Sequence, residues 1–282
     1  MDSLVSTAWL ADHIDDAGLL VLDASSHLPA TGRDARAEFA TGHIPGARFL
    51  DLASLKDASS PVPNALPTGV QVAERLASLG WQQGTMIVIY DDSAVKTSAR
   101  AWFALRRAGV ASALLDGGLG KWKAEGRPLE AGEPSASGVG AAPALETTEA
   151  LVRTKADMLA NIDSRAEQVI DARDGERFSA ASADAVHGLP GGHIPGACNL
   201  FFRDLYAEDG TFLPLPELRA AFSAAGVDLE RPITTSCGSG VTASVLLFAL
   251  HLLGKDDAAL YDGSWSEWGA DPDTPKESGA AR

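Results

Sequence analysis

The hexapeptide GHIPGA stands at Gly42–Ala47 and again at Gly192–Ala197 in this chain of 282 residues. Two further stretches recur around it in the same order and at nearly the same spacing. LVLDAS (Leu20–Ser25) matches QVIDAR (Gln168–Arg173), and LLDGGLGKW (Leu114–Trp122) matches LYDGSWSEW (Leu260–Trp268). Three ordered matches indicate a tandem duplication of a unit of roughly 120 residues.

Short apolar runs alternate with segments of helical periodicity in each copy. Continuous apolar runs predict strands buried on both faces, and their alternation with helices predicts an α/β fold: two tandem domains, each a mostly parallel sheet with helices on both faces. Binding sites in such sheets form at the carboxyl ends of the strands. The predicted strands are Leu19–Asp23, Met86–Tyr90, Ala113–Asp116, Val169–Asp171, Ile233–Ser236 and Ala259–Asp262, and the predicted helices are Val70–Leu79, Ser98–Arg107, Pro216–Ala225 and Thr242–Leu253.

The domain boundaries follow from a change in composition between the copies. The stretch from Pro128 to Glu146 is rich in Pro, Gly, Ser and Ala and has no periodic apolar face, which is typical of a linker. We therefore predict an N-terminal domain over residues 1–127, a linker over 128–146 and a C-terminal domain over 147–282.

Composition and charge exclude several function classes. The chain carries 23 Lys and Arg against 38 Asp and Glu, a formal net charge of −15, which disfavours binding to nucleic acid. No apolar run approaches the ~20 residues of a membrane span, and the N-terminus lacks a signal-peptide pattern. Two cysteines, Cys198 and Cys237, indicate neither a disulfide framework nor a zinc site. We expect a cytoplasmic protein that needs no metal or organic cofactor.

The two copies differ at the end of one predicted strand, where alignment sets Asp91 of the first copy against Cys237 of the second. The segment CGSGVT, Cys237–Thr242, then links strand to helix. Its glycines allow backbone N–H groups to turn inward, and such a loop at a helix N-terminus binds anions and stabilises a thiolate. We therefore expect a nucleophilic Cys237 in the second copy and no thiol chemistry in the first. A buried, inert cysteine beside a glycine-rich turn is the alternative. The remaining residues of the predicted anion cradle are Gly238, Ser239, Gly240, Val241 and Thr242.

These residues also carry a resemblance to a known family. The chain resembles the tandem-domain rhodanese-like sulfurtransferases over nearly its whole length. The loop looks like that of members that use 3-mercaptopyruvate, whereas members that use thiosulfate commonly have a basic residue within it. The stretches that carry the resemblance are LDASSHLP (Leu22–Pro29), GRDARAEFATGHIPGA (Gly32–Ala47), DGGLGKW (Asp116–Trp122), GHIPGA (Gly192–Ala197), CGSGVTAS (Cys237–Ser244) and YDGSWSEWG (Tyr261–Gly269).

The resemblance implies a two-step sulfur transfer. Cys237 would take the sulfur of 3-mercaptopyruvate and release pyruvate, and the resulting persulfide would pass its outer sulfur to an acceptor. The implied acceptors are thioredoxin, a small thiol or, in an assay, cyanide. Arg177, in the Glu176–Phe178 element, matches the family's arginine for the substrate carboxylate. Arg173 is expected to support the site.

Three positions depart from the family pattern. Val186 stands where these enzymes usually have a second substrate arginine, and the neighbouring His187 is a candidate substitute donor. Ala53 stands at the position of an acid proposed to join the cysteine and the loop serine, here Ser239, in a proton relay. Asn64 stands where a histidine is usual.

Several residues outside the loop have simpler expected roles. His43 and His193 occur in both copies, including the copy without the thiol, so we expect them to be structural. Cys198 is expected to be an inert thiol. Trp265 has no tryptophan counterpart in the first copy, and we expect it to reach a cleft between the domains.

Three rival functions stay open from the sequence. A thiosulfate sulfurtransferase would use the same nucleophile with another donor. A persulfide carrier would hold sulfur on Cys237 without turnover. A cysteine phosphatase would need an arginine six positions after the cysteine, where this chain has Ala243, so transition-state charge would be poorly neutralised.

Overall fold

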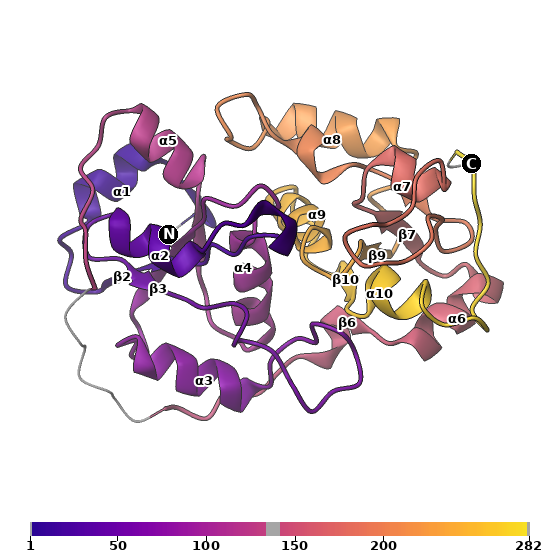
Figure 1. Ribbon diagram of the computed structural model, residues 1–282, viewed down its shortest axis with the longest axis horizontal. Helices are drawn as coiled ribbons and strands as arrows, with labels where there is room; N and C mark the ends of the chain where they lie inside the picture. The colour runs from indigo at the N-terminus through magenta and orange to yellow at the C-terminus, as the bar shows by residue number, and fades with distance from the viewer. Residues whose placement is uncertain (1, 134–141, 281–282) are drawn as a thin grey trace. The chain divides into compact units, whose positions relative to one another are not determined.

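The computed structural model describes residues 2–133 and 142–280. Two compact units divide the chain (Figure 1): unit 1 comprises Met1–Asp57, Leu66–Thr148 and Glu208–Phe212, and unit 2 comprises Ala58–Ala65, Glu149–Ala207 and Leu213–Arg282. Residues Ala58–Ala65 thus belong to unit 2 although they lie in the N-terminal half of the sequence, and Glu208–Phe212 belong to unit 1 although they lie in the C-terminal half. Part of the predicted linker, residues 134–141, lies outside the described residues.

Each unit contains one parallel sheet of the same topology. In unit 1 the strand order is β1-β5-β4-β2-β3, and in unit 2 it is β6-β10-β9-β7-β8. The strands of unit 1 are β1 (Leu4–Val5), β2 (Leu19–Asp23), β3 (Arg48–Phe49), β4 (Met86–Tyr90) and β5 (Ala113–Leu115). Those of unit 2 are β6 (Val152–Arg153), β7 (Gln168–Asp171), β8 (Cys198–Asn199), β9 (Ile233–Ser236) and β10 (Ala259–Tyr261).

Helices lie between successive strands of each sheet, and one more helix follows the last strand, α5 in unit 1 and α10 in unit 2 (Figure 1). In unit 1 they are α1 (Thr7–His13), α2 (Ala35–Thr41), α3 (Gly69–Ser78), α4 (Ser98–Arg107) and α5 (Gly118–Ala124). In unit 2 they are α6 (Lys155–Ser164), α7 (Gly175–Ser179), α8 (Leu215–Ala224), α9 (Ala243–Leu252) and α10 (Ser264–Trp268). None of the helices within the described residues is long and apolar enough to cross a membrane.

The fold class predicted from the sequence is confirmed. All six predicted strands and all four predicted helices are present, with ends that shift by one residue at most. The strands at the centre of each sheet are buried because helices cover them. Strand β4 of unit 1 is accordingly apolar, whereas β9 of unit 2 also buries the hydroxyl side chains of Thr234, Thr235 and Ser236. Helix α9 is buried over Ala243–Leu250, so it lies at the centre of unit 2 and gives the loop before it a rigid support.

The GHIPGA motifs hold the end of each repeat against its body. The backbone of His43 exchanges two hydrogen bonds with Glu130, and that of His193 exchanges two with Glu277. The rings of His43 and His193 stack on Phe39 and Phe178, at 3.9 and 3.8 Å between centroids. Both histidines are buried. The structure thus gives both a packing role, as we expected.

Candidate active site

The candidate site of unit 2 forms at the carboxyl ends of β7 and β9. These strands pair in parallel with Asp171 level with Ser236, so the residues that follow each strand emerge at the same edge of the sheet. Arg173 and Cys237 are among these residues. The parallel register therefore brings the predicted nucleophile and a guanidinium to one edge, where α/β proteins place their sites.

Cys237 is the first residue of the loop between β9 and α9, and only 1% of its surface is exposed. The backbone N–H of Gly240 donates a hydrogen bond to its Sγ, with a nitrogen–sulfur distance of 3.1 Å. Gly240 has a φ of +79°, a left-handed conformation that glycine adopts without strain. This conformation allows the loop to turn back over the sulfur, so one amide of the predicted cradle does face the thiol.

Helix α10 anchors the other side of the cysteine. Ser264 Oγ accepts a hydrogen bond from the Cys237 N–H at 3.1 Å and donates one to the Tyr261 carbonyl at 2.9 Å. The N–H of Trp265 donates to the Cys237 carbonyl at 2.9 Å. Ser264 has a φ of +48°, which is strained for a residue with a side chain. Gly118 holds the equivalent position of the first repeat, with a φ of +56°.

Arg173 is a buried cation beside the cysteine. Its guanidinium pairs with Asp171 at 2.6 Å and with Asp184 at 3.4 Å, donates to the Gly192 carbonyl, and stacks over Trp265. Burial alone would lower the pKa of Arg173, but the negative charges of Asp171, Asp184 and Cys237 together raise it. Arg173 therefore holds a permanent positive charge, paired with two carboxylates, close to the cysteine.

Asp184 is the buried acid at the centre of the site, and the sequence pattern gave no sign of it. Its two oxygens contact Arg173, Arg177 and His187, and no part of its surface is exposed. Burial would raise the pKa of Asp184, but the hydrogen bond from His187 and the charges of His187, Arg177 and Arg173 lower it to about 2. Asp184 is therefore ionised at neutral pH, and it holds the side chains of Arg173, Arg177 and His187 in one cluster.

Arg177 and His187 both belong to this cluster. Arg177 lies on α7, where its Nε donates to Asp174 at 2.6 Å and its Nη1 approaches Asp184 at 3.5 Å. His187 Nδ1 is hydrogen-bonded to Asp184 Oδ1 at 2.9 Å. The ring packs directly on Gly238, because a Cβ at Gly238 would lie 2.7 Å from Nε2. Val186, beside it, is 50% exposed.

The remaining loop residues hold the cradle in place. The carbonyl of Ser239 accepts a hydrogen bond from Asn64 Nδ2 at 3.0 Å, within unit 2. The Gly240 carbonyl accepts one from Ser244 Oγ at 2.8 Å, and the Val241 carbonyl accepts one from the Ser244 N–H. Asn64 is thus a site residue that the sequence identified only as a departure from a family pattern.

Three other sequence expectations have a structural outcome. Trp265 was expected to face a cleft between domains, but this was wrong: it is 1% exposed within unit 2, because its ring covers the Arg173 guanidinium and its Nε1 donates to the Pro190 carbonyl. Cys198 is half-buried on β8, and burial raises the pKa of its thiol, which disfavours a thiolate there. Thr242 lies at the N-cap of α9 without a side-chain capping bond.

The corresponding loop of unit 1 holds a carboxylate in place of the thiol. Asp91 Oδ1 accepts the Ser93 N–H at 2.8 Å, and Oδ2 accepts the Ser98 N–H at 2.7 Å. The Asp91 carbonyl accepts the Leu119 N–H, as the Cys237 carbonyl accepts that of Trp265. Both loops are thus held at their first residue by the N–H of a later helix, but the unit 1 loop has one more residue before its helix begins; a carboxylate stands there at the position of the thiol.

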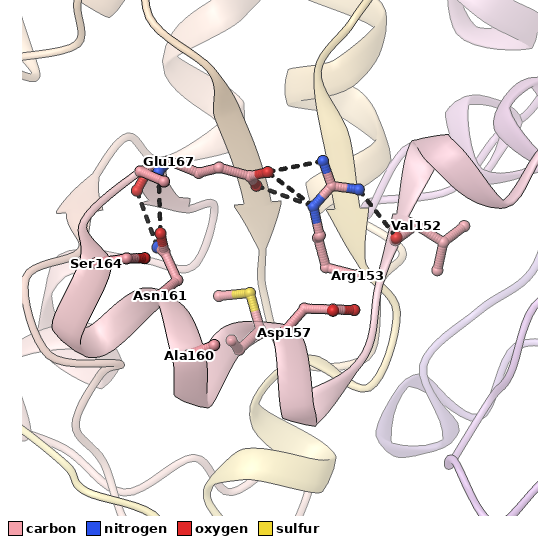
Figure 2. Close-up of a pocket in the computed structure, with 9 residues that line it drawn as sticks. Val152, Arg153, Asp157, Ala160, Asn161, Ser164 and Glu167 are labelled. Atoms are coloured by element: carbon pink, nitrogen blue, oxygen red, sulfur yellow. Dashed lines mark hydrogen bonds and ion pairs between the residues drawn. The ribbon is translucent and has the colours of Figure 1, made fainter.

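A surface pocket of unit 2 lies apart from this arrangement. Figure 2 shows it beside α6, with Arg153 and Glu167 facing one another across it. The Glu167 carboxylate forms an ion pair with the Arg153 guanidinium at 2.7 Å. Arg153 Nη1 also donates hydrogen bonds to the carbonyls of Ala150 and Val152. Arg153 and Glu167 are thus paired with one another, and the third charged residue of the lining, Asp157, is hydrogen-bonded to Thr154 at the start of α6.

Known proteins share both the sequence and the fold. Rhodanese-like domains match residues 6–125 and 154–271. The chain is 40% identical over 275 residues to the 3-mercaptopyruvate sulfurtransferase of Escherichia coli (strain K12), with 97% of each chain covered. It is 39% identical over 276 residues to the Homo sapiens protein of that name, with 94% and 91% covered, and 39% identical over 273 residues to the thiosulfate sulfurtransferase of Gallus gallus, with 94% and 93% covered.

A solved structure agrees with these relatives. The crystal structure of SseA from Escherichia coli, described as a 3-mercaptopyruvate sulfotransferase, matches with a TM-score of 0.84 at 37% identity, covering 94% of this chain and 99% of that one. The likeness therefore extends over both repeats. The chain belongs to the rhodanese-like family, with a rhodanese-like domain in each half.

Proposed function

We propose that this protein is a 3-mercaptopyruvate sulfurtransferase. Cys237 takes the sulfur of 3-mercaptopyruvate, pyruvate leaves, and the cysteine persulfide passes its outer sulfur to a thiol or to cyanide. The observation that carries the proposal is the Gly240 N–H on the Cys237 sulfur, at the end of a strand and beside the buried cation Arg173. An anionic sulfur is stabilised there both by a fixed dipole and by a full charge.

The other predicted site residues have proposed roles that fit their positions. Arg177, partly exposed above Asp184, binds the donor carboxylate. Ser239, Val241 and Thr242 border the opening of the loop with partly exposed surface, and Gly238 leaves room for the imidazole of His187. Unit 1, with Asp91 in place of the cysteine, is proposed to be non-catalytic. A reducing compartment such as the cytoplasm would keep Cys237 a thiol, and thioredoxin is a candidate acceptor there.

The choice of donor rests on loop electrostatics. Thiosulfate is a dianion, and Gly238 and Ser239 supply no charge to the loop. The relative from Gallus gallus named thiosulfate sulfurtransferase nevertheless makes thiosulfate the second candidate donor. Measurement of kcat/KM for both donors decides between them, and a large preference for thiosulfate would overturn the first choice.

Intact mass spectrometry tests the reaction class and the nucleophile together. Wild-type protein exposed to 3-mercaptopyruvate without acceptor should gain the mass of one sulfur atom, and Cys237→Ala should gain none. Cys198→Ala serves as the matched control and should gain sulfur normally. A persulfide that resists added thiols would instead support a carrier, and unchanged wild-type mass would refute the proposal.

A further inference from the structure

The loop from Asp184 to Leu189 holds a histidine against the candidate active-site loop. Two backbone hydrogen bonds join the ends of this loop, from Asp184 N–H to the Leu189 carbonyl and from Leu189 N–H to the Asp184 carbonyl, each 2.9–3.1 Å long. His187 lies between them, and its N–H donates to the Asp184 carbonyl. The turn is therefore fixed at its base and presents the His187 side chain from a defined position.

The two nitrogens of the His187 ring have different environments. Nδ1 contacts the Asp184 carboxylate at 2.9 Å, whereas Nε2 has no hydrogen-bond partner among residues 2–133 and 142–280. The Cε1 atom, which lies between the two nitrogens, faces Gly238, the residue after the candidate nucleophile, and the His187 side chain keeps 17% of its surface exposed. One nitrogen is thus held by the protein, and the other is available to a bound molecule.

The charge on Asp184 sets the tautomer of this histidine. Asp184 is buried beside the guanidinium groups of Arg173 and Arg177, which keep it ionised, so it accepts a hydrogen bond from the imidazole and cannot donate one. Neutral His187 therefore carries its proton on Nδ1 and offers the lone pair of Nε2. A carboxylate that orients an imidazole in this way is the arrangement of a general base.

We propose that His187 carries a proton during the first half-reaction, an inference that rests on the proposed function. The thiol proton of 3-mercaptopyruvate passes to Nε2 as the Cys237 thiolate attacks the donor sulfur. The S–S bond forms, the C–S bond breaks, and its electron pair becomes the enolate of pyruvate. The proton then passes from Nε2 to the methylene carbon, which completes pyruvate and leaves the negative charge on the outer sulfur of the persulfide.

The glycine at position 238 fits this role as well as a packing role. A Cβ there would overlap the imidazole, so Gly238 is what allows the ring to approach the loop so closely. Packing alone does not distinguish donors, but a proton carrier does. Inorganic polysulfide transfers sulfur with a sulfur leaving group, so its reaction with Cys237 protonates no carbon and needs no shuttle.

The test compares the two donors on His187→Asn. Asparagine can keep a hydrogen bond to Asp184 but has no Nε2, so the turn is preserved and the proton carrier is lost. We expect the rate of persulfide formation from 3-mercaptopyruvate to fall about 100-fold or more, the usual contribution of general acid–base catalysis. Loading by polysulfide, followed by intact mass, should stay within about threefold of wild type. His251→Asn is the matched control, because His251 also contacts a carboxylate, Asp256, through Nδ1.

Chemical rescue provides a second measurement that does not depend on a conservative replacement. In His187→Ala, added imidazole should restore the reaction with 3-mercaptopyruvate and leave polysulfide loading unchanged. Equal losses with both donors, or no loss with 3-mercaptopyruvate, would overturn the proposal. Failure of wild-type protein to form a persulfide from 3-mercaptopyruvate would instead refute the proposed function, so the two failures are distinguishable.

Discussion

Removal of the Asp91 carboxylate should destabilise unit 1, because this side chain completes a loop that lacks its own reactive group. Asp91 is 6% exposed, and its two oxygens accept the N–H groups of Ser93 and Ser98 at 2.8 and 2.7 Å. Ser98 is the first residue of α4, so its N–H has no partner within the helix. Asp91→Ala removes both acceptors at once.

The expected loss follows from the burial of the two donors. Ser93 is 5% exposed, so its N–H would be left without water or protein partner, which costs about 1–3 kcal/mol. Ser98 is partly exposed and resembles a helix capping site, where such a loss costs about 1 kcal/mol. The sum is about 3 kcal/mol, or a decrease of roughly 10 °C in Tm for a unit of this size. Asp91→Asn should lose about half as much, because one oxygen remains.

Thermal and urea unfolding of Asp91→Ala measure this effect. Asp51→Ala is the matched control: Asp51 accepts the Ala53 N–H in an exposed turn, and its removal should change stability by about 0.5 kcal/mol at most. Added sulfate should stabilise Asp91→Ala more than wild type at equal ionic strength, since the amides would be free to bind an anion. A loss below about 1 kcal/mol, with no selective effect of sulfate, would refute this account of the loop.

Three further predictions follow from single groups. Ser264→Ala should destabilise unit 2 by about 1 kcal/mol more than Ser264→Gly. Both variants lose the hydrogen bond to the Cys237 N–H, but only glycine adopts the positive φ without strain. Urea unfolding of the two variants measures the difference. Burial raises the pKa of Asp23 from 3.8 to about 6, so the unfolded chain loses this proton first and the free energy of unfolding should fall by roughly 2 kcal/mol from pH 4 to pH 6; Asp23→Asn should abolish that slope in pH-dependent unfolding. Arg177→Ala should raise KM for 3-mercaptopyruvate about 10- to 100-fold without blocking persulfide loading by polysulfide, since it removes a charge-assisted carboxylate contact.

The central strands and the candidate nucleophile were predictable because their signals are local. Apolar runs such as Met86–Tyr90 give buried strands wherever they occur, and the comparison of repeats isolated Cys237 against Asp91. The short outer strands, such as Arg48–Phe49, were not predictable, since two residues show no periodicity. Their pairing is set by the strand beside them.

The supporting residues of the site could not be read from the sequence, because long-range contacts define them. Asp184 lies in no motif, and its importance comes from three partners that the fold brings together. Asn64 reaches the loop from a segment that is distant in sequence. Ser264 left one readable signal: it replaces Gly118 of the first repeat, and a glycine in one copy suggests a left-handed backbone in both.

The loop of unit 1 indicates where the negative charge of a persulfide would lie in unit 2. A persulfide extends the Cys237 side chain by one atom, from Cβ–Sγ to Cβ–Sγ–Sδ. It then has as many atoms in line as the aspartate side chain at position 91, Cβ–Cγ–Oδ. Asp91 reaches the amide two residues further along the chain, that of Ser93. Counted from the end of the strand, the amide at the same place in unit 2 is that of Ser239, although the unit 2 loop is one residue shorter; the thiol itself accepts the N–H of Gly240. If the Ser239 amide serves the outer sulfur as the Ser93 amide serves Asp91, loading with sulfur should increase the protection of the Ser239 amide from hydrogen exchange.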